Sequence, residues 1–207
     1  TLGTFSALRK YSLWDNVFTG IALIFYSMPV FFVSLAAIYI FAVAFRRWGL
    51  PYAPIAGMYE VGEPRTLANL VRHMILPVVS LALISAASYS RYVRASVLEA
   101  MNRDYVRTAR AKGLRERTIF SRHVLKNAAL PLITIVGLDL PFLLGGAIVT
   151  ERIFAWPGMG MLFIESLGRS DYPVLMGILM FIAVAVVTFQ LLTDVIYSLL
   201  DPRIRLA

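Results

Sequence analysis

Four stretches of this 207-residue sequence are long and apolar enough to cross a lipid bilayer, and they constrain the fold more than any other feature. They cover residues 17–45, about 74–92, 128–149 and 173–200. None shows the strict alternation of a membrane β-barrel strand. A bilayer offers no water to unpaired backbone groups, so helices are the predicted structure. The sequence predicts an all-α, polytopic membrane protein with four full spans.

Proline and glycine residues are expected to disturb the helices of the first and the third stretch. The first, at 29 residues, exceeds the roughly 20 that a span needs, so we expect it to tilt or to kink at Pro29. The third contains Pro131, Pro141 and the pair Gly145 and Gly146. These breaks are candidate hinges in that helix.

Composition supports the membrane interpretation and excludes several kinds of site. Hydrophobic residues make up 59% of the chain, and charged residues 15%, against roughly 25% in soluble domains. There is no cysteine, which excludes disulfide frameworks and cysteine-based metal sites. With only His73 and His123 in the chain, a histidine-rich metal cluster is excluded too, and no metal site is predicted.

The distribution of positive charge predicts the orientation. The loop at residues 91–127 carries ten basic and three acidic residues. Placing this loop and both termini in the cytoplasm puts 14 of the 20 Lys and Arg residues there, against 6 in the opposite topology. Trp14, Trp48 and Trp156 fall at predicted span ends, where aromatic residues meet the lipid headgroups.

The two ends of the sequence also lead to expectations. The opening "TLGTFSALRKYS" lacks the layout of a signal peptide, and we expect it to be the cytoplasmic end of an earlier transmembrane helix. The chain would then be a fragment; a processed N-terminus is the alternative. Residues 201–207 are expected to form a cytoplasmic tail.

Within the basic loop, residues 104–113 have the features of a short capped helix. Asp104 is predicted to be its N-cap, Lys112 suits the negative end of the helix dipole, and Gly113 suits a left-handed C′ position. A second amphipathic segment follows, "ERTIFSRHVLKNA", in which Ile119, Val124 and Leu125 are predicted to share an apolar stripe.

Pattern alone leaves three interpretations of this loop. It could be a solvated anchor that meets anionic lipid, a nucleic-acid patch, or a docking element for a cytoplasmic partner. The nucleic-acid interpretation is the weakest, because each short helix has a single aromatic residue and offers no stacking platform. The capped helix and the glycine at the bend favour docking.

Three separated motifs carry a family resemblance. They are "LEAMNRDYVRTARAKGLRERTIFSRHVLKNAALPLITIVGL", "LLGGAIVTERIFAWPGMGMLFIESLGRSDYPVLMG" and the closing "DPRIR". Together they resemble inner-membrane permease subunits of ABC importers, in the branch that serves oligopeptides, dipeptides and nickel. The resemblance implies a type I importer transmembrane domain over residues 1–200, lacking its N-terminal part, with a cytoplasmic coupling loop at 96–127.

In such importers a short helix of this loop inserts into a cleft of the ATPase subunit. The family pattern is Glu-Ala-Ala, three residues, then Gly. Here Arg107, Thr108 and Ala109 occupy the first three positions and Gly113 the last, with Arg107 replacing the acidic residue. Pro131 follows Gly113 by 18 residues instead of 13, a further departure that resembles the peptide branch. The resemblance assigns docking to Asp104, Tyr105, Arg107, Thr108, Ala109, Lys112 and Gly113.

The resemblance also implies partners. No G-x-x-x-x-G-K-[ST] phosphate loop is present, so the chain is expected to be no enzyme and to hold no cofactor, with ATP and Mg²⁺ on a partner. The expected partners are cytoplasmic ATPase subunits, a second homologous permease, an extracytoplasmic substrate-binding protein and the lipid bilayer, without nucleic acid. The expected location is the plasma (inner) membrane of a bacterium or archaeon.

Several polar and breaker residues are candidates for the translocation pathway. An ionised carboxylate at mid-span costs about 2.5–3.5 kcal/mol on insertion scales. Asp139 is therefore expected to line the pathway and attract a substrate's ammonium group, or to make an interhelical hydrogen bond. A protonated carboxyl or a group at the lipid edge is the third alternative. Asp194 is expected to bond a neighbouring helix. Pro141, Gly145 and Gly146 are the hinge candidates.

The external loop contains "FAWPGMGMLF", in which Trp156, Pro157 and Gly158 are either a gate near the binding protein or a surface turn. Two further functions stay open at the level of sequence. One is an ion-coupled carrier that uses Asp139 and Asp194 as a relay, and the other is a membrane anchor that transports nothing. The substrate itself cannot be identified from the residues.

Overall fold

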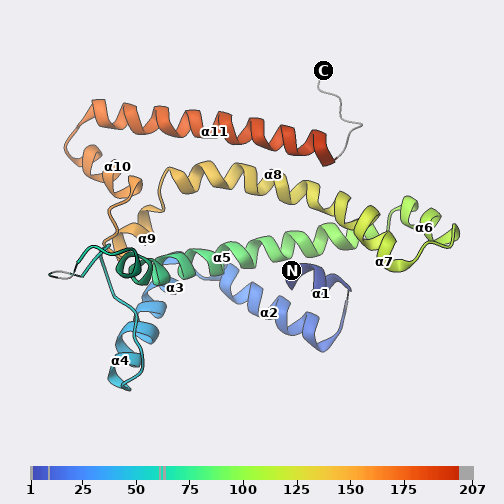
Figure 1. The fold of residues 1–207 in the computed structure, drawn as a ribbon, viewed down its shortest axis with the longest axis horizontal. Helices are drawn as coiled ribbons and strands as arrows, with labels where there is room; N and C mark the ends of the chain where they lie inside the picture. Colours follow the sequence, from blue (N-terminus) through green and yellow to red (C-terminus); the bar gives the residue numbers. More distant parts are fainter. Residues whose placement is uncertain (1, 9, 61, 63, 201–207) are drawn as a thin grey trace. The chain divides into compact units, whose positions relative to one another are not determined.

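The computed structural model describes residues 2–8, 10–60, 62 and 64–200, and every regular element within them is helical (Figure 1). Four helical runs in this part are long and apolar enough to cross a membrane: Val30–Arg47, Leu67–Met101, Glu116–Leu144 and Tyr172–Leu200. This confirms the all-α prediction. The predicted tail at 201–207 lies outside the described residues, as do Arg203 and Arg205.

The first apolar stretch is broken instead of merely kinked. After α1 (Leu2–Leu8), α2 covers Leu13–Ser27, and a new helix begins with α3 (Val30–Ile38). It continues through the π-helical segment η1 (Tyr39–Ala44) into α4 (Phe45–Arg47). Pro29 has extended backbone angles, φ −60° and ψ 142°, and occupies the N-cap position of α3. Proline has no N–H to donate back to the preceding turn, so α2 ends before it.

Prolines elsewhere do not interrupt their helices. α5 covers Leu67–Met101, which extends well beyond the predicted residues 74–92 at both ends. Pro77 lies inside this helix. α7 (Glu116–Ile119), the π-helical η2 (Phe120–Val124) and α8 (Leu125–Leu144) form one continuous run through Pro131 and Pro141. This run ends at Gly145 and Gly146, where Gly146 has φ +109°. The glycine pair, and neither proline, ends the third span.

Shorter helices complete the described elements. α6 (Asp104–Ala111) lies between α5 and α7, while α9 (Ile148–Ile153) and α10 (Met159–Gly168) lie in the predicted external loop. α11 covers Tyr172–Leu200, almost the predicted range.

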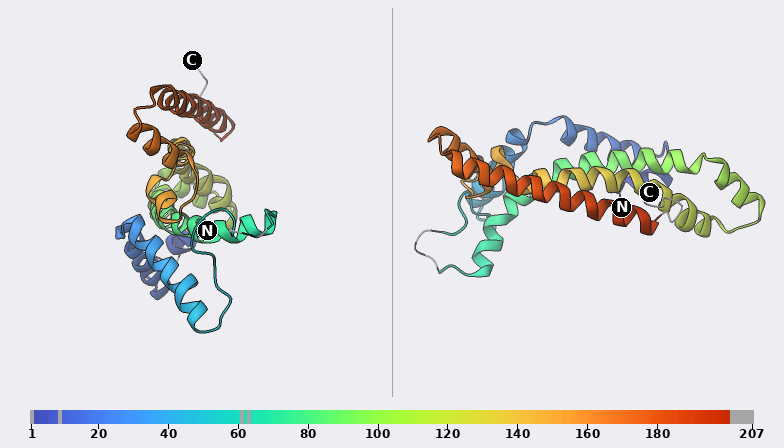
Figure 2. Two further views of the ribbon diagram at one scale, coloured as in Figure 1. Left: turned by 90° about the vertical axis from the view of Figure 1, so that its left-hand side faces the viewer. Right: turned by 90° about the horizontal axis from the view of Figure 1, so that it is seen from above.

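The chain divides into two compact units. The first comprises Thr1–Ile24, Ala86–Leu140 and Val186–Ala207, and the second Phe25–Ser85 and Pro141–Ala185. Within the first unit, the C-terminal half of α5 and the N-terminal part of α8 lie side by side (Figures 1 and 2).

Small side chains form the core of the first unit and allow its helices to approach closely. An added Cβ on Gly3 would collide with the backbone carbonyl of Ser90, so α1 lies directly on α5. The buried cluster beneath α6 consists of Ala7, Val97, Ala100, Val106, Ala109, Ile119, Val124 and Ala128.

The second unit is held together around Phe154, which is only 1% exposed. It packs in one cluster with Ala37, Ala42 and Leu76. The Phe154 carbonyl also accepts a 2.8 Å hydrogen bond from the backbone N–H of Gly57. The loop before α5 is thereby tied to the end of α9.

Candidate functional site

The start of α6 differs from the prediction for Asp104. Arg103 occupies the N-cap position with extended angles, φ −74° and ψ 151°, and no side chain caps the helix. Asp104 is instead the first helical residue, where its carboxylate still interacts favourably with the positive end of the helix dipole. Its side chain is exposed and lies 3.8 Å from the Arg107 guanidinium.

The end of α6 confirms the prediction for Gly113, which has φ +73°. The N–H of Gly113 donates to the Arg110 carbonyl at 2.9 Å, and the N–H of Leu114 donates to the Ala109 carbonyl at 3.3 Å. These two bonds are the Schellman arrangement that a left-handed C′ residue makes possible. Lys112 is the C-cap residue, directly after the last helical residue Ala111, so its charge lies at the negative end of the helix dipole as expected.

α6 has one buried face and one exposed face. Val106 is 0% and Ala109 5% exposed, both inside the core of the first unit. Asp104, Tyr105, Arg107, Thr108, Lys112 and Gly113 are all exposed. Ala109 therefore packs α6 against the core, while the other six predicted docking residues are exposed on its outer side.

A second contact fixes the bend after α6. The Arg110 guanidinium donates to both carboxylate oxygens of Glu116, at 2.7 and 3.3 Å, across the Gly113 turn. The hydrogen bond to Glu116 raises the pKa of Arg110 above its ordinary value. Both side chains are exposed, so the pair contributes little to stability but orients α6 relative to α7.

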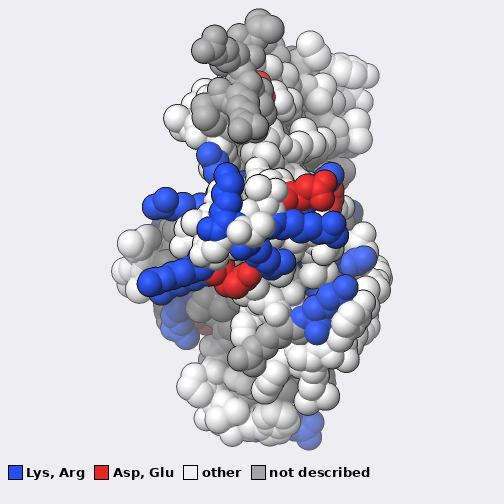
Figure 3. All heavy atoms as spheres, turned by 90° about the vertical axis from the view of Figure 1, so that its right-hand side faces the viewer, with Lys and Arg blue, Asp and Glu red and all other residues white. Residues whose placement is uncertain are grey.

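The surface around α6 is strongly basic. Lys and Arg side chains dominate the centre of the face that carries α6 and α7 (Figure 3). A cleft of about 270 Å³ opens in the same unit, lined by Glu99 and Arg103 before α6, Tyr105 on it, and Asn127 and Pro131 on α8. An exposed helix beside an open cleft is suited to contact with a partner.

The predicted apolar stripe of the next segment is confirmed in part. Ile119 and Val124 are 1% and 2% exposed, but Leu125 is 42% exposed. The π-helical turn at 120–124 adds a residue to the turn, so Val124 joins Ile119 on the buried face and Ala128 follows Val124 four residues later. Leu125 lies beside Val124 but outside the buried face, so the prediction for Leu125 was wrong.

Asp139 makes an interhelical hydrogen bond. The Tyr89 hydroxyl on α5 donates to Oδ2 of Asp139 on α8 at 2.8 Å, and both side chains are partly buried. The interhelical hydrogen bond is one of the roles expected for Asp139.

Asp194 does not bond a neighbouring helix in the described part of the chain. Its carboxylate accepts from Gln190, one turn earlier on α11, at 3.5 Å. The neighbour-facing residue is Thr193, which is 5% exposed and packs against Gly137 of α8. Tyr197 then donates to the Leu130 carbonyl at 3.0 Å.

Glu151 is a structural centre that sequence reasoning missed. It is 9% exposed, and its carboxylate accepts from the backbone N–H of Ala147 at 3.1 Å and of Met161 at 2.8 Å. An added Cβ on Gly146, Gly158 or Gly160 would press against this carboxylate. The signal that could have revealed this role is a single acidic residue, Glu151, in an apolar segment that also contains Gly146, Gly158 and Gly160.

The gate candidates form the turn between α9 and α10. Trp156 is half-buried, and its backbone N–H donates to the backbone carbonyl of Glu151 at 2.8 Å. Pro157 is exposed. Ala155 just before them has φ +45°, a left-handed conformation that is strained for alanine. The hinge candidates lie in the same unit: Pro141 is fully buried within α8, and Gly145 and Gly146 follow its end.

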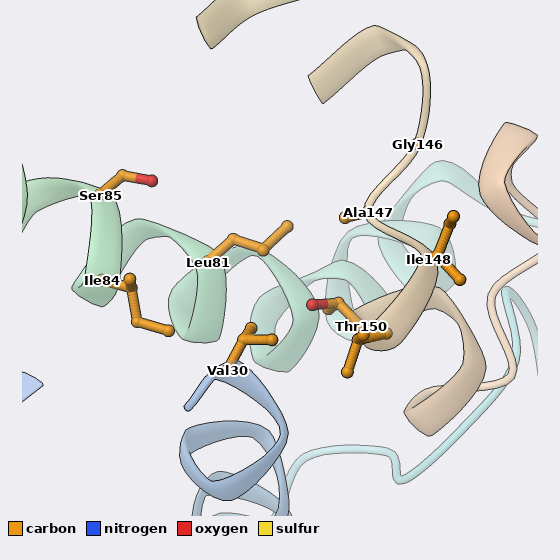
Figure 4. Close-up of a pocket in the computed structure, with 9 residues that line it drawn as sticks. Val30, Leu81, Ile84, Ser85, Gly146, Ala147, Ile148 and Thr150 are labelled. Carbon is orange, nitrogen blue, oxygen red and sulfur yellow. The ribbon is translucent and has the colours of Figure 1, made fainter. Parts of the chain in front are cut away.

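The second unit also holds an apolar cavity of about 300 Å³ (Figure 4). Val30, Leu81, Ile84 and Ser85 line it together with residues 146–150. The Thr150 hydroxyl is buried in the wall without a hydrogen-bond partner in the described part of the chain.

A buried ion pair joins two segments 79 residues apart. Arg94 donates to both carboxylate oxygens of Asp15, at 2.9 and 2.8 Å, and Ser6 and the N–H of Tyr11 also donate to it. The Arg94 and Ser6 hydrogen bonds hold the pKa of Asp15 well below its usual range. No pattern in the sequence indicated this pair.

No group of three or more acidic or histidine side chains that could hold a metal occurs among the described residues.

Comparisons with known proteins identify the family. The sequence profile of the family described as "Binding-protein-dependent transport system inner membrane component" matches residues 1–206. A putative peptide permease protein of Brucella suis is 42% identical over 99% of this chain, which spans 63% of that relative.

Two further relatives carry names that refer to peptides. The oligopeptide transport system permease protein AppB of Bacillus subtilis is 40% identical over 98% of the chain, which covers 63% of AppB. The dipeptide transport system permease protein DppB of Escherichia coli is 38% identical over 99% of the chain, which covers 65% of DppB. The chain thus spans slightly less than two thirds of each relative's length.

Proposed function

The chain belongs to the family of binding-protein-dependent transport system inner membrane components, and on that premise we propose that it is a permease subunit of an ATP-driven peptide importer. It would form part of the translocation pathway and receive energy from a cytoplasmic ATPase bound around Asp104 and Gly113. The names of its relatives support peptides as the substrate class.

The geometry of α6 is the observation that carries this proposal. Its inner face is fixed in the core by Val106 and Ala109, and its end is fixed by the Schellman bonds at Gly113. Its outer face is exposed and basic. A helix anchored in this way moves as one body with the helices beside it, which suits a docking element better than a flexible lipid anchor.

Short connections would transmit this motion. α5 ends at Met101, three residues before Asp104, and the run that becomes α8 begins at Glu116, three residues after Gly113. Displacement of α6 would tilt α5 and α8. Gly145 and Gly146, where α8 ends, would absorb the change as a hinge. The pathway would then alternate between outward-open and inward-open states.

The proposed topology places the basic loop and both ends of the sequence in the cytoplasm of a bacterium or archaeon. The segment around Trp156, Pro157 and Gly158 would then lie outside, where it would meet the substrate-binding protein. A second, homologous permease would complete the pathway.

Substitution of Gly113 by valine tests the coupling role. Holding a residue that has a side chain in the left-handed conformation costs about 1–2 kcal/mol of conformational free energy. This cost is roughly a 5- to 30-fold change in the equilibrium between the folded and unfolded conformations. We expect ATP-dependent peptide uptake into proteoliposomes of the assembled complex to fall by about that factor, while ATP hydrolysis continues.

Gly49→Val is the matched control. Gly49 has φ +69° and, like Gly113, open space around an added Cβ, so the backbone strain is the same. Gly49 lies outside the basic loop, and its variant should keep coupled uptake. Equal uptake by the Gly113 variant and the wild type would contradict the proposal.

The same assay separates the two alternative functions. Uptake driven by a proton or sodium gradient without ATP would indicate an ion-coupled carrier. A complex that recruits the ATPase but imports no solute under any gradient would indicate an anchor.

A further inference from the structure

We propose that Asp139 and Tyr89 form a cation-binding subsite that receives the ammonium group of the transported solute. This inference rests on the proposed transport function and adds a recognition role that the coupling mechanism does not require.

The carboxylate of Asp139 is only half satisfied. Tyr89 donates to Oδ2 at 2.8 Å, and Oδ1 has no hydrogen-bond partner among the described residues. The side chain is partly exposed, so a group outside this chain can reach the free oxygen. The hydroxyl of Tyr89 orients the carboxylate and leaves one acceptor open.

No cation of the described part of the chain compensates Asp139. The ion pairs there are Asp15–Arg94, Glu99–Arg103, Asp104–Arg107 and Arg110–Glu116. Asp139 lies within the span Glu116–Leu144, where an ionisable side chain is costly unless it faces water or a partner. Its position therefore calls for a group of opposite charge from elsewhere.

Asp15 and Glu151, the buried carboxylates among the described residues, show what a purely structural carboxylate looks like here. Asp15 accepts from Arg94, Ser6 and a backbone N–H. Glu151 accepts from two backbone N–H groups. Each uses both of its oxygens, whereas Asp139 uses one. This contrast separates Asp139 from Asp15 and Glu151, and its bond to another helix separates it from Asp194.

An ammonium group fits the open oxygen best. It would make a charge-assisted hydrogen bond to Oδ1, and the adjacent Tyr89 ring can attract a cation to its face. A metal ion would need further acidic or histidine ligands, and no such group is found among the described residues. A peptide carries one ammonium group at its N-terminus, so the subsite would guide that end through the pathway.

Asp139→Asn is the sharpest test, because asparagine keeps the size and can still accept the Tyr89 hydrogen bond while losing the charge. The full complex with its binding protein is placed in proteoliposomes. ATP-dependent uptake is measured for a dipeptide and for its analogue without the α-amino group. Each solute is supplied at a concentration that saturates the binding protein, so that differences arise in the permease.

We expect the wild-type complex to prefer the dipeptide, and Asp139→Asn to lower this preference at least about tenfold, as expected for loss of a hydrogen bond to a charged group. Asp194→Asn is the matched control, since it removes a carboxylate that bonds within its own helix, and the preference should stay unchanged. If Asp139→Asn does not accumulate in the membrane, Tyr89→Phe takes its place. Tyr89→Phe leaves the negative charge of Asp139 in place but removes the hydrogen bond that orients the carboxylate. This variant should lower the preference for the dipeptide by a smaller factor than Asp139→Asn.

Normal uptake with an unchanged preference in the variant would overturn the subsite and leave the transport proposal intact. Loss of the second permease from the purified Asp139→Asn complex would also overturn it, because Asp139 would then pair with that subunit. No ATP-dependent uptake by the wild-type complex would remove the transport function and the subsite together.

Discussion

At the scale of single residues, charges in this apolar chain differ in how they are compensated. Asp15 is 1% exposed and pairs with Arg94, which connects the segment around α1 and α2 to α5. Glu99, at the end of α5, and Arg103, directly before α6, form by contrast an exposed pair. Removing one partner of a buried pair leaves an uncompensated charge, whereas removing an exposed one changes little.

Asp15→Asn should therefore destabilise the protein by about 3 kcal/mol, the lower end for a broken buried pair, because the Arg94 side chain keeps 27% of its surface exposed. Thermal unfolding of the purified protein in detergent measures this change. The control Glu99→Gln should stay within about 0.5 kcal/mol of the wild type. A loss below 1 kcal/mol for the Asp15 variant would show that the pair does not hold these helices together.

Residue-scale features were predictable only where their signal is local. Gly113 was identified because a left-handed C′ residue follows its helix directly. Asp15 and Arg94 are 79 residues apart, and their contact depends on packing that no local pattern encodes. Asp104 was misplaced by one residue, because Arg103 takes the N-cap conformation without a capping side chain.

At the scale of elements, the turn between α8 and α10 is organised by the Glu151 carboxylate. It accepts backbone hydrogen bonds from both sides of α9, and Gly146, Gly158 and Gly160 make room for it. The fold of the segment between α8 and α10 thus depends on the Glu151 side chain and on the absence of a Cβ atom at three glycines.

Gly160→Ala should loosen this segment, since its Cβ would press against Ile148 and the Glu151 carboxylate. Trypsin cleavage after the exposed Arg152 reports the loosening, and we expect it to be several-fold faster in the variant. Gly168→Ala, in the same helix with open space around its Cβ, is the control and should cleave at the wild-type rate. Equal cleavage of both variants would contradict the role given to Glu151.

Element types were predictable, but several boundaries were not. Apolar length was sufficient to predict the spans, because a bilayer permits little else. The effect of each proline depended on its surroundings: Pro29 separates two helices, while Pro77, Pro131 and Pro141 remain inside theirs. The π-helical turn at 120–124 lets Ile119 and Val124, five residues apart, share the buried face, which a regular period cannot anticipate.

At the scale of the whole molecule, charge and apolar surface occupy different parts of the chain. Along α11, Met176, Met180, Val187 and Leu191 are each at least 60% exposed, as expected of a helix whose outer face meets lipid or another membrane subunit. The basic residues concentrate in the loop that contains α6. This separation supports a membrane-spanning part and a charged part that can contact a partner within one chain.

The most direct test of the account is cross-linking from α6 to the ATPase. This sequence has no cysteine of its own, so a single one can be introduced at Arg107, which is exposed on α6, or at Arg46, which is exposed at the end of the first span. In membranes that contain the assembled complex, Arg107→Cys should cross-link to the ATPase subunit and Arg46→Cys should not. Equal cross-linking at both positions, or none at Arg107, would contradict the claim that α6 is the docking element.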